Sequence, residues 1–321
     1  GTAAGTLRVR ILDESSSGTN AGISATSDGH LVIAAYSSLP WDDLAILLWA
    51  SDGTSAGTDL GRRIPTTAAG FSFPFFGRSD AGVLVWKGED NSSSELWFSD
   101  GTDAGTVRLA VFHASYSWLD SIGGIKSDGS SVYFIASSDG RRSLWRSDLT
   151  PDSTRPILDV SGWQAHVGNA VVLGDWLIVL RCANGADTGC GLWRVPKTGG
   201  AGEPLAGGCG SGPCDPVDPN SSMSQVGGQV VFRTSTTERG SLWASDGSDS
   251  SATELARLCT GNECSSQCFQ RQSSEDDYAF ATSQDCNAPL TLWVSDGSPE
   301  GTFRVAGSLD ELDPGTSAAG P

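Results

Sequence analysis

The stretch ELWFSDGTDAGT, residues 95–106, recurs through the chain in close copies. Each copy begins with a Leu-Trp pair, and successive tryptophans lie 48, 48, 48, 50 and 50 residues apart. The six repeated tryptophans are Trp49, Trp97, Trp145, Trp193, Trp243 and Trp293. An interval this regular, of about 50 residues, indicates an array in which each repeat is one supersecondary unit.

The residues around each Leu-Trp pair predict four short strands. A β-rich run such as VLVWKG at 83–88 precedes the pair, and most runs follow a Gly/Asp turn and another short strand. A further strand, such as TVRLAVF at 106–112, follows the second Gly-Thr. Strands joined by tight turns, without helical periodicity, predict antiparallel meanders. We therefore expect an all-β fold, a β-propeller of six four-stranded antiparallel blades, or of seven if upstream residues are missing.

The repeated residues have structural explanations. Leu and Trp point to opposite faces of the third strand, and both faces of a blade pack against neighbours. The tryptophans are therefore expected to be mostly buried, in equivalent positions. In the Ser-Asp-Gly-Thr turn, the Asp carboxylate can accept backbone N–H bonds and Gly supplies a positive φ.

This motif resembles the ELWxxDGTxxGT repeat of secreted and surface proteins of bacteria, notably myxobacteria. The resemblance covers nearly the whole chain, is closest at 53–58, 101–106 and 297–302, and is eroded around Trp145 and Trp193. It implies a propeller and an exported protein, extracellular or at the cell surface. It implies no particular catalytic activity.

The array predicts one propeller over residues 13–310, followed by a flexible Pro/Gly/Ala/Ser tail at 311–321. Residues 1–12 repeat the pattern of a fourth strand without a blade before them. Three interpretations stay open: the stump of a longer array, a clasp that closes the ring, or a strand, Thr6–Leu12, donated to another copy of the chain. We favour the clasp, because intramolecular pairing has the higher effective concentration.

Eight cysteines lie in the second half of the chain, between Cys182 and Cys286. An even, clustered set favours disulfides and an oxidising compartment over a zinc site, since no histidine lies near them and the spacings lack paired CxxC motifs. The expected pairs are Cys182–Cys190, Cys209–Cys214, Cys259–Cys264 and Cys268–Cys286.

The charge and the apolar content limit the partners. A formal net charge of -18 disfavours nucleic acid and anionic membrane surfaces, and no apolar run approaches the roughly 20 residues of a spanning helix. A protein or glycan ligand is the expected partner. No cofactor or metal site is predicted, although calcium remains an alternative for acidic clusters such as 89–91, 215–220 and 275–277.

No catalytic constellation stands out. Ser55 in GTSAG fits the pattern of a nucleophile elbow, but it lies within the repeat turn. Three tryptophans outside the repeat are candidates for an exposed ligand surface: Trp41, Trp118 and Trp163. The sequence therefore favours a non-enzymatic exported propeller acting in extracellular structure, adhesion or ligand binding. The alternative is a polysaccharide-active hydrolase or lyase, which would need two carboxylates about 5–9 Å apart.

Overall fold

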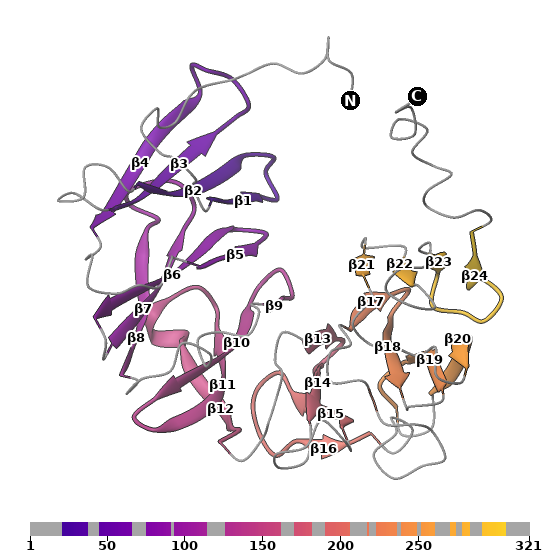
Figure 1. Ribbon diagram of the computed structural model, residues 1–321. Helices are drawn as coiled ribbons and strands as arrows, with labels where there is room; N and C mark the ends of the chain where they lie inside the picture. The colour runs from indigo at the N-terminus through magenta and orange to yellow at the C-terminus, as the bar shows by residue number, and fades with distance from the viewer. Residues whose placement is uncertain are drawn as a thin grey trace, which may run out of the picture. The chain divides into compact units, whose positions relative to one another are not determined.

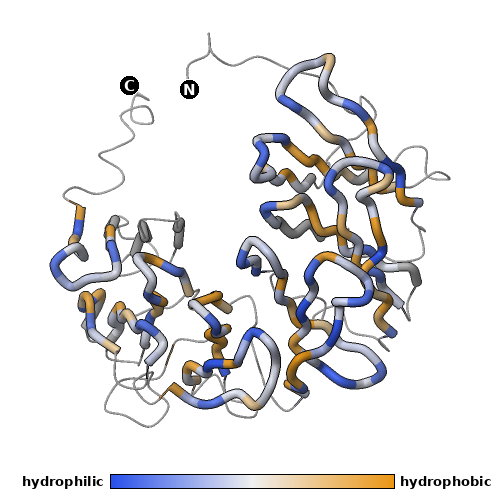
Figure 2. The backbone as a smooth tube through the Cα atoms, turned by 180° about the vertical axis from the view of Figure 1, so that it is seen from behind, coloured by the Kyte–Doolittle hydropathy of each residue, from blue (hydrophilic) through white to orange (hydrophobic). Residues whose placement is uncertain are grey.

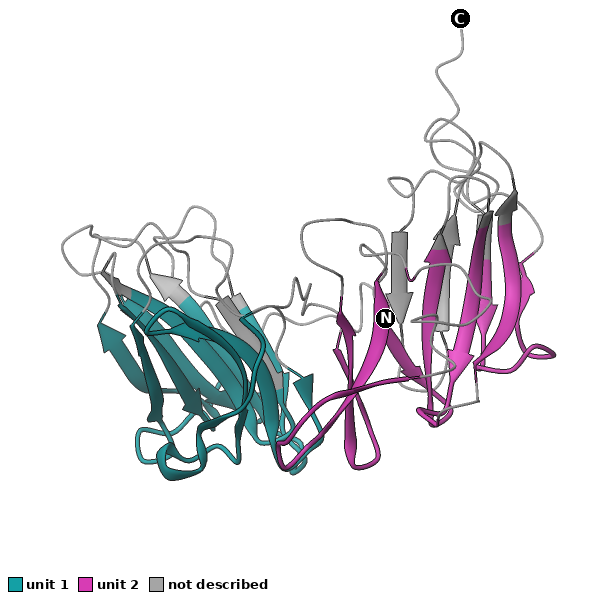
Figure 3. Ribbon diagram, turned by 90° about the horizontal axis from the view of Figure 1, so that it is seen from below, with its two compact units in different colours: residues 1–161 teal, residues 162–321 magenta. Residues whose placement is uncertain are grey.

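The computed structural model forms two compact units, Gly1–Ser161 and Gly162–Pro321, coloured separately in Figure 3. The residues that the structure describes are 21–37, 45–65, 75–90, 93–113, 126–161, 170–181, 190–205, 217, 223–235, 239–248, 252–260, 270–273, 278–282 and 291–305. Within these ranges the fold is all-β, and one turn of 3-10 helix, η2 (Pro151–Ser153), is the only helical element. No helix in the described ranges is long and apolar enough to cross a membrane.

The first unit contains three four-stranded antiparallel sheets, each in chain order (Figure 1). The first sheet is β1 (Ala21–Ala25), β2 (Leu31–Ser37), β3 (Ala45–Ser51) and β4 (Thr58–Pro65). The second is β5 (Phe75–Ser79), β6 (Gly82–Asp90), β7 (Ser93–Ser99) and β8 (Val107–His113). The third is β9 (Lys126–Ser127), β10 (Val132–Ser138), β11 (Arg141–Ser147) and β12 (Arg155–Asp159).

The second unit repeats this plan with three more sheets of four antiparallel strands. They comprise β13 (Ala170–Leu173), β14 (Trp176–Arg181), β15 (Gly191–Pro196) and β16 (Glu203–Pro204); β17 (Ser224–Val226), β18 (Gln229–Ser235), β19 (Arg239–Ser245) and β20 (Thr253–Thr260); and β21 (Gln270–Ser273), β22 (Tyr278–Thr282), β23 (Thr291–Ser295) and β24 (Phe303–Arg304). The predicted all-β class and antiparallel meanders are thus confirmed.

All six repeated tryptophans occupy the same register, in the third strand of a sheet. Their partners in the second strand are Ile33, Val85, Phe134, Val179, Phe232 and Phe280. Trp49 is 4% exposed, and the other five are half-buried. In four sheets the pairing with the fourth strand shifts by one residue between Leu and Trp, a β-bulge that the sequence did not signal.

The turn after each Leu-Trp strand is a network of side-chain hydrogen bonds. In the second sheet, Asp100 Oδ1 accepts from Thr102 N at 2.8 Å, and Ser99 Oγ accepts from Gly101 N at 3.0 Å. Ser99 Oγ also lies 2.8 Å from Thr106 Oγ1, which ties the start of the turn to its end. The same bond from the glycine N–H to the serine Oγ recurs in the first, fifth and sixth sheets, so the shared Ser-Asp-Gly sequence specifies one turn geometry.

The second glycine of the motif is required by the aspartate rather than by its own backbone angle. A Cβ at Gly105 would lie 2.0 Å from Asp100 Oδ2, and Gly57 and Gly301 meet Asp52 and Asp296 in the same way. The first glycine has φ +92 at Gly101, in the left-handed region. Where the motif is eroded, Leu149 takes this position at φ 62, and its side chain packs against an apolar cluster.

Apolar clusters join neighbouring sheets inside each unit. In the first unit, Val32, Ile46 and Leu48 pack with Val83 and Val85 of the next sheet. A second cluster joins that sheet to β10 and β11. Backbone hydrogen bonds reinforce both contacts: Ser27 N to Asp80 O at 2.9 Å, and Asp139 N to His113 O at 2.6 Å. Figure 2 shows the hydrophobic residues along the strands and the hydrophilic ones at the turns. Stacked sheets of this kind are the packing mode of propeller blades.

Two glycines provide a matched test of this stacking. Gly53 and Gly101 have φ +88 and +92, but a Cβ at Gly53 meets nothing within 4 Å, whereas a Cβ at Gly101 lies 2.8 Å from Ala50 Cβ in the neighbouring sheet. Gly53→Ala should cost about 1 kcal/mol through backbone strain alone. Gly101→Ala should cost a further 1–3 kcal/mol or so, the range for overpacking. Urea denaturation of both variants measures the difference; equal losses would contradict close packing at this turn.

Candidate functional site

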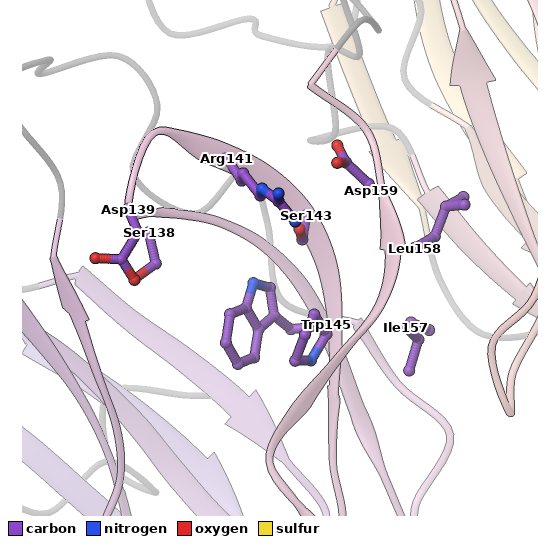
Figure 4. A pocket seen from close by; sticks show the side chains of 9 residues that line it. Ser138, Asp139, Arg141, Ser143, Trp145, Ile157, Leu158 and Asp159 are labelled. Carbon is purple, nitrogen blue, oxygen red and sulfur yellow. The ribbon is translucent and has the colours of Figure 1, made fainter.

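A pocket of about 740 Å³ lies on the third sheet, at the end of the β10–β11 hairpin and along β12. Its lining is shown in Figure 4 and comprises Ser138, Asp139, Arg141, Ser143, Trp145, Pro156, Ile157, Leu158 and Asp159. The volume is within the range of about 300–1,000 Å³ typical of small-molecule sites. The lining combines one aromatic ring, aliphatic side chains, two carboxylates and a guanidinium group.

Strand periodicity and a bulge bring these side chains together. Arg141, Ser143 and Trp145 alternate along β11, so all three project from one face of the sheet. Ser143 pairs with Asp159 of β12, and Trp145 pairs with Pro156. The bulge between Leu144 and Trp145 leaves Ile157 as the extra residue of β12. In Figure 4 the indole of Trp145 lies in the middle of this group, and Leu158 points away from it.

The Trp145 ring is fixed from behind by two phenylalanines. Phe112 of β8 makes an edge contact with it, with ring centroids 5.0 Å apart, and Phe134 of β10 stacks on it at 6.3 Å. Both phenylalanines are fully buried. A rigid aromatic surface at a partly open pocket is a preorganised contact, because little side-chain entropy remains to be lost on binding.

The indole N–H of Trp145 is buried and has no hydrogen-bond partner in the described structure. Two other repeated tryptophans do have one: Trp97 Nε1 donates to Glu95 Oε2 at 2.9 Å, and Trp243 Nε1 donates to Thr234 Oγ1 at 3.1 Å. In the third sheet the positions equivalent to Glu95 and Thr234 hold Ser143 and Ala136. Since a buried N–H without a partner costs about 1–3 kcal/mol, this N–H would gain free energy from an acceptor on a ligand that displaces the groups covering it.

Charged groups surround this donor. Hydrogen bonds from the Ser161 side chain and from its backbone N–H, the latter 2.8 Å from Asp159 Oδ1, hold the pKa of Asp159 below its usual value; Arg141 lowers it further. Asp159 is therefore a carboxylate at neutral pH. At the hairpin turn, Ser138 Oγ donates to Asp139 Oδ2 at 3.1 Å, and His113 N donates to Ser138 Oγ at 3.2 Å. The pocket thus offers both donors and acceptors.

A second cluster of charges lies on the second sheet, and two of its three members, Lys87 and Glu95, are buried. Lys87 Nζ lies 3.2 Å from Glu95 Oε2 and donates to Pro65 O at 3.1 Å. The side chains of Lys87 and Glu95 are 5% and 7% exposed. Arg108, itself half exposed, binds Glu95 Oε1 at 2.6 Å. Every charge in this cluster has a partner, so it is a structural ion pair rather than a binding site.

This buried pair predicts a specific response to acid. Burial alone would raise the pKa of Glu95, but hydrogen bonds from Trp97, Arg108 and Lys87 outweigh it, and the pKa lies below 4.5. Glu95 therefore contributes stability that is fully present above pH about 4.5 and is lost as the pH falls through the lowered folded-state pKa. Urea midpoints from pH 7 to pH 3 should fall more steeply for the natural protein than for the Lys87→Met/Glu95→Leu double variant. An equal dependence of the urea midpoint on pH in the two proteins would contradict this prediction.

Several residues predicted from sequence lie outside the described residues. They are Trp41, Trp118 and Trp163, the strand at Thr6–Leu12, the tail, and six cysteines: Cys182, Cys209, Cys214, Cys264, Cys268 and Cys286. Cys259 lies in β20, and Cys190 is buried and disulfide-bonded. The four cysteine pairings stay predictions. In the described ranges, no three His, Cys, Asp or Glu side chains are grouped to hold a metal ion.

The pocket residues were not predicted from the sequence. Trp145 was assigned a structural role as a repeat position, and Asp139, Arg141 and Asp159 carry no motif. One signal was available: the third repeat replaces Glu95 by Ser143, which removes the acceptor of the indole N–H.

Comparisons with known proteins place the fold among β-propellers. No family model matches the chain, and no curated protein matches it. Among solved structures, a prolyl endopeptidase matches with a TM-score of 0.55 and 11% identity, over 89% of this chain and 42% of the other. The propeller domain of the Trilobed protease from Pyrococcus furiosus matches with a TM-score of 0.50 and 11% identity, over 90% and 86%. A puromycin hydrolase matches with a TM-score of 0.47 and 17% identity, over 91% and 47%.

These matches correct the functional prediction. At such identities they show the fold alone, and this chain spans only 42% of the prolyl endopeptidase. The two matches with a TM-score of 0.50 or more nevertheless come from a prolyl endopeptidase and a protease, which contradicts the predictions that the chain is not an enzyme and acts in structure or adhesion; the hydrolase alternative has the better support. The sequence misled because its repeated residues are structural, whereas the residues that confer activity on a fold need not repeat.

Proposed function

We propose that this chain is itself a hydrolase built on a β-propeller, and that the pocket around Trp145 binds its substrate. The observation that carries the proposal is the pocket itself: a fixed indole with a free buried N–H, beside Arg141 and two carboxylates, on a fold that recurs in hydrolases. A concave pocket that combines apolar side chains with a few convergent polar groups is the default candidate for a substrate site.

We also propose that the six sheets close into one six-bladed ring. Each sheet carries the same strand order and the same tryptophan register, which supports six equivalent blades. The likeness to the Trilobed protease propeller supports the architecture. Membership of the ELWxxDGTxxGT family, export and the disulfide framework belong to the same proposal and rest on the sequence.

The hydrolase proposal is tested by incubating the purified chain with two polymer panels, polysaccharides and unfolded proteins. We expect soluble fragments from at least one panel, detected as new reducing ends or by mass spectrometry. Thermal inactivation excludes a contaminating enzyme. The activity of the natural protein should disappear at its own unfolding midpoint, and the activity of Gly101→Ala should disappear at the lower midpoint of that variant. The proposal is wrong if the folded protein releases no fragments, or if both proteins lose activity at the same temperature despite their different unfolding midpoints.

A further inference from the structure

We infer that the pocket around Trp145 binds a neutral oligosaccharide; the inference rests on the proposed function and names the substrate class. Charge gives the first argument. Asp139 and Asp159 against Arg141 leave the pocket with one net negative charge, on a chain of net charge -18. An anionic ligand is repelled by both the pocket and the protein as a whole.

The polar groups give the second argument. The Trp145 N–H and the Arg141 guanidinium can only donate hydrogen bonds, the two carboxylates can only accept, and the Ser143 hydroxyl can do both. A sugar hydroxyl both donates and accepts, so neighbouring hydroxyls on one ring can satisfy donors and acceptors together. These groups all belong to side chains, whereas peptide recognition by strand addition depends on backbone groups.

The apolar surface gives the third argument. The half-buried Trp145 ring and the aliphatic side chains of Pro156 and Ile157 lie beside the polar groups. A pyranose or furanose ring has C–H groups on its faces and hydroxyls at its edge, which matches an apolar surface surrounded by polar groups. The volume of about 740 Å³ accommodates a short oligosaccharide rather than a single small ion.

The test replaces Trp145 by phenylalanine, which keeps an aromatic ring and removes the N–H. Trp97→Phe is the matched control, because the Trp97 N–H is already bonded to Glu95 and that residue does not line the pocket. The probes are neutral hexasaccharides (maltohexaose, cellohexaose and arabinohexaose), an anionic galacturonate hexamer and a neutral hexapeptide. Calorimetry measures affinity, and NMR follows the indole N–H signal that Trp145→Phe deletes.

We expect one of the neutral hexasaccharides to bind and to shift the Trp145 indole signal. Trp145→Phe should bind it about tenfold more weakly, the effect of one lost hydrogen bond, while Trp97→Phe should bind it normally. The two variants should also differ in stability: both lose packing, but Trp97→Phe should lower the unfolding midpoint further than Trp145→Phe, because only Trp97→Phe also removes an existing hydrogen bond. Preferential binding of the galacturonate or the peptide, or equal sugar binding by Trp145→Phe, would overturn the inference.

The outcomes separate this inference from the proposed function. Fragments released from proteins, with no sugar bound at Trp145, would leave the hydrolase standing and refute the sugar site. A neutral hexasaccharide that binds at Trp145, without release of fragments from either panel, would support the sugar site and refute the hydrolase.

Discussion

Glu95→Leu is expected to destabilise the protein by about 3–5 kcal/mol, because it leaves the Lys87 ammonium buried without its counter-ion. The Lys87 side chain is 5% exposed and also donates to the Pro65 carbonyl, which carries no charge to balance the ammonium group. Adding Lys87→Met removes the stranded charge and should recover most of the loss. The double variant should remain about 1–3 kcal/mol below the natural protein, since the Trp97 N–H loses its acceptor.

A surface ion pair provides the control for this cycle. Arg62 Nη1 lies 2.8 Å from Asp103 Oδ1, but the two side chains are 37% and 74% exposed. Arg62→Ala should therefore lower the free energy of unfolding by less than about 1 kcal/mol. Urea denaturation of the three variants and the natural protein measures all the differences. A Glu95→Leu variant within 1 kcal/mol or so of the natural protein would show that the pair is hydrated, contrary to the structure. A double variant no more stable than the single one would show that the loss comes from packing rather than from charge.

Phe112→Ala should cost about 3–5 kcal/mol, the range for large aromatic truncations in a core. Phe112 is fully buried on the fourth strand of the second sheet and contacts Trp86 at 5.0 Å, Phe134 at 6.1 Å and Trp145 at 5.0 Å. Two of these partners belong to the third sheet, so the truncation opens a cavity between two sheets rather than within one.

Val111 precedes Phe112 in the strand and points to the opposite face, where it is 38% exposed. Val111→Ala should therefore change stability by no more than about 0.5 kcal/mol, as most surface substitutions do. Thermal or urea unfolding distinguishes the two. Similar effects of both variants would mean that the second and third sheets are not packed through Phe112.

The sequence predicted the fold well because the same physical requirement is repeated six times. The Leu-Trp pair, the Ser-Asp-Gly-Thr turn and the second Gly-Thr each have one structural cause, and Asp100 accepts backbone N–H bonds as expected. The reason for the second glycine was missed, because the contact between Gly105 and the Asp100 carboxylate depends on a turn closed in three dimensions.

The pocket could not be predicted in the same way. Its residues occupy positions that the repeat does not fix: Ser143 where the second sheet has Glu95 and the fifth has Ser241, and Asp139 at φ 52 in a hairpin turn. Their significance depends on what surrounds the Trp145 indole, and a sequence does not report a missing hydrogen-bond partner. A repeat pattern identifies the residues that every unit needs, whereas a binding site is made where one unit differs.

The closed six-bladed ring is tested most directly by one distance between the first and sixth sheets. Leu60, Arg108 and Arg304 occupy equivalent positions, opposite Trp49, Trp97 and Trp293, and all three are exposed. Spin labels on unnatural amino acids at these positions leave the cysteines untouched, and double electron–electron resonance gives the distances. The ring predicts that the first and sixth sheets are neighbours, so Leu60–Arg304 should match the Leu60–Arg108 distance of two adjacent sheets. A clearly longer Leu60–Arg304 distance would contradict the closed propeller.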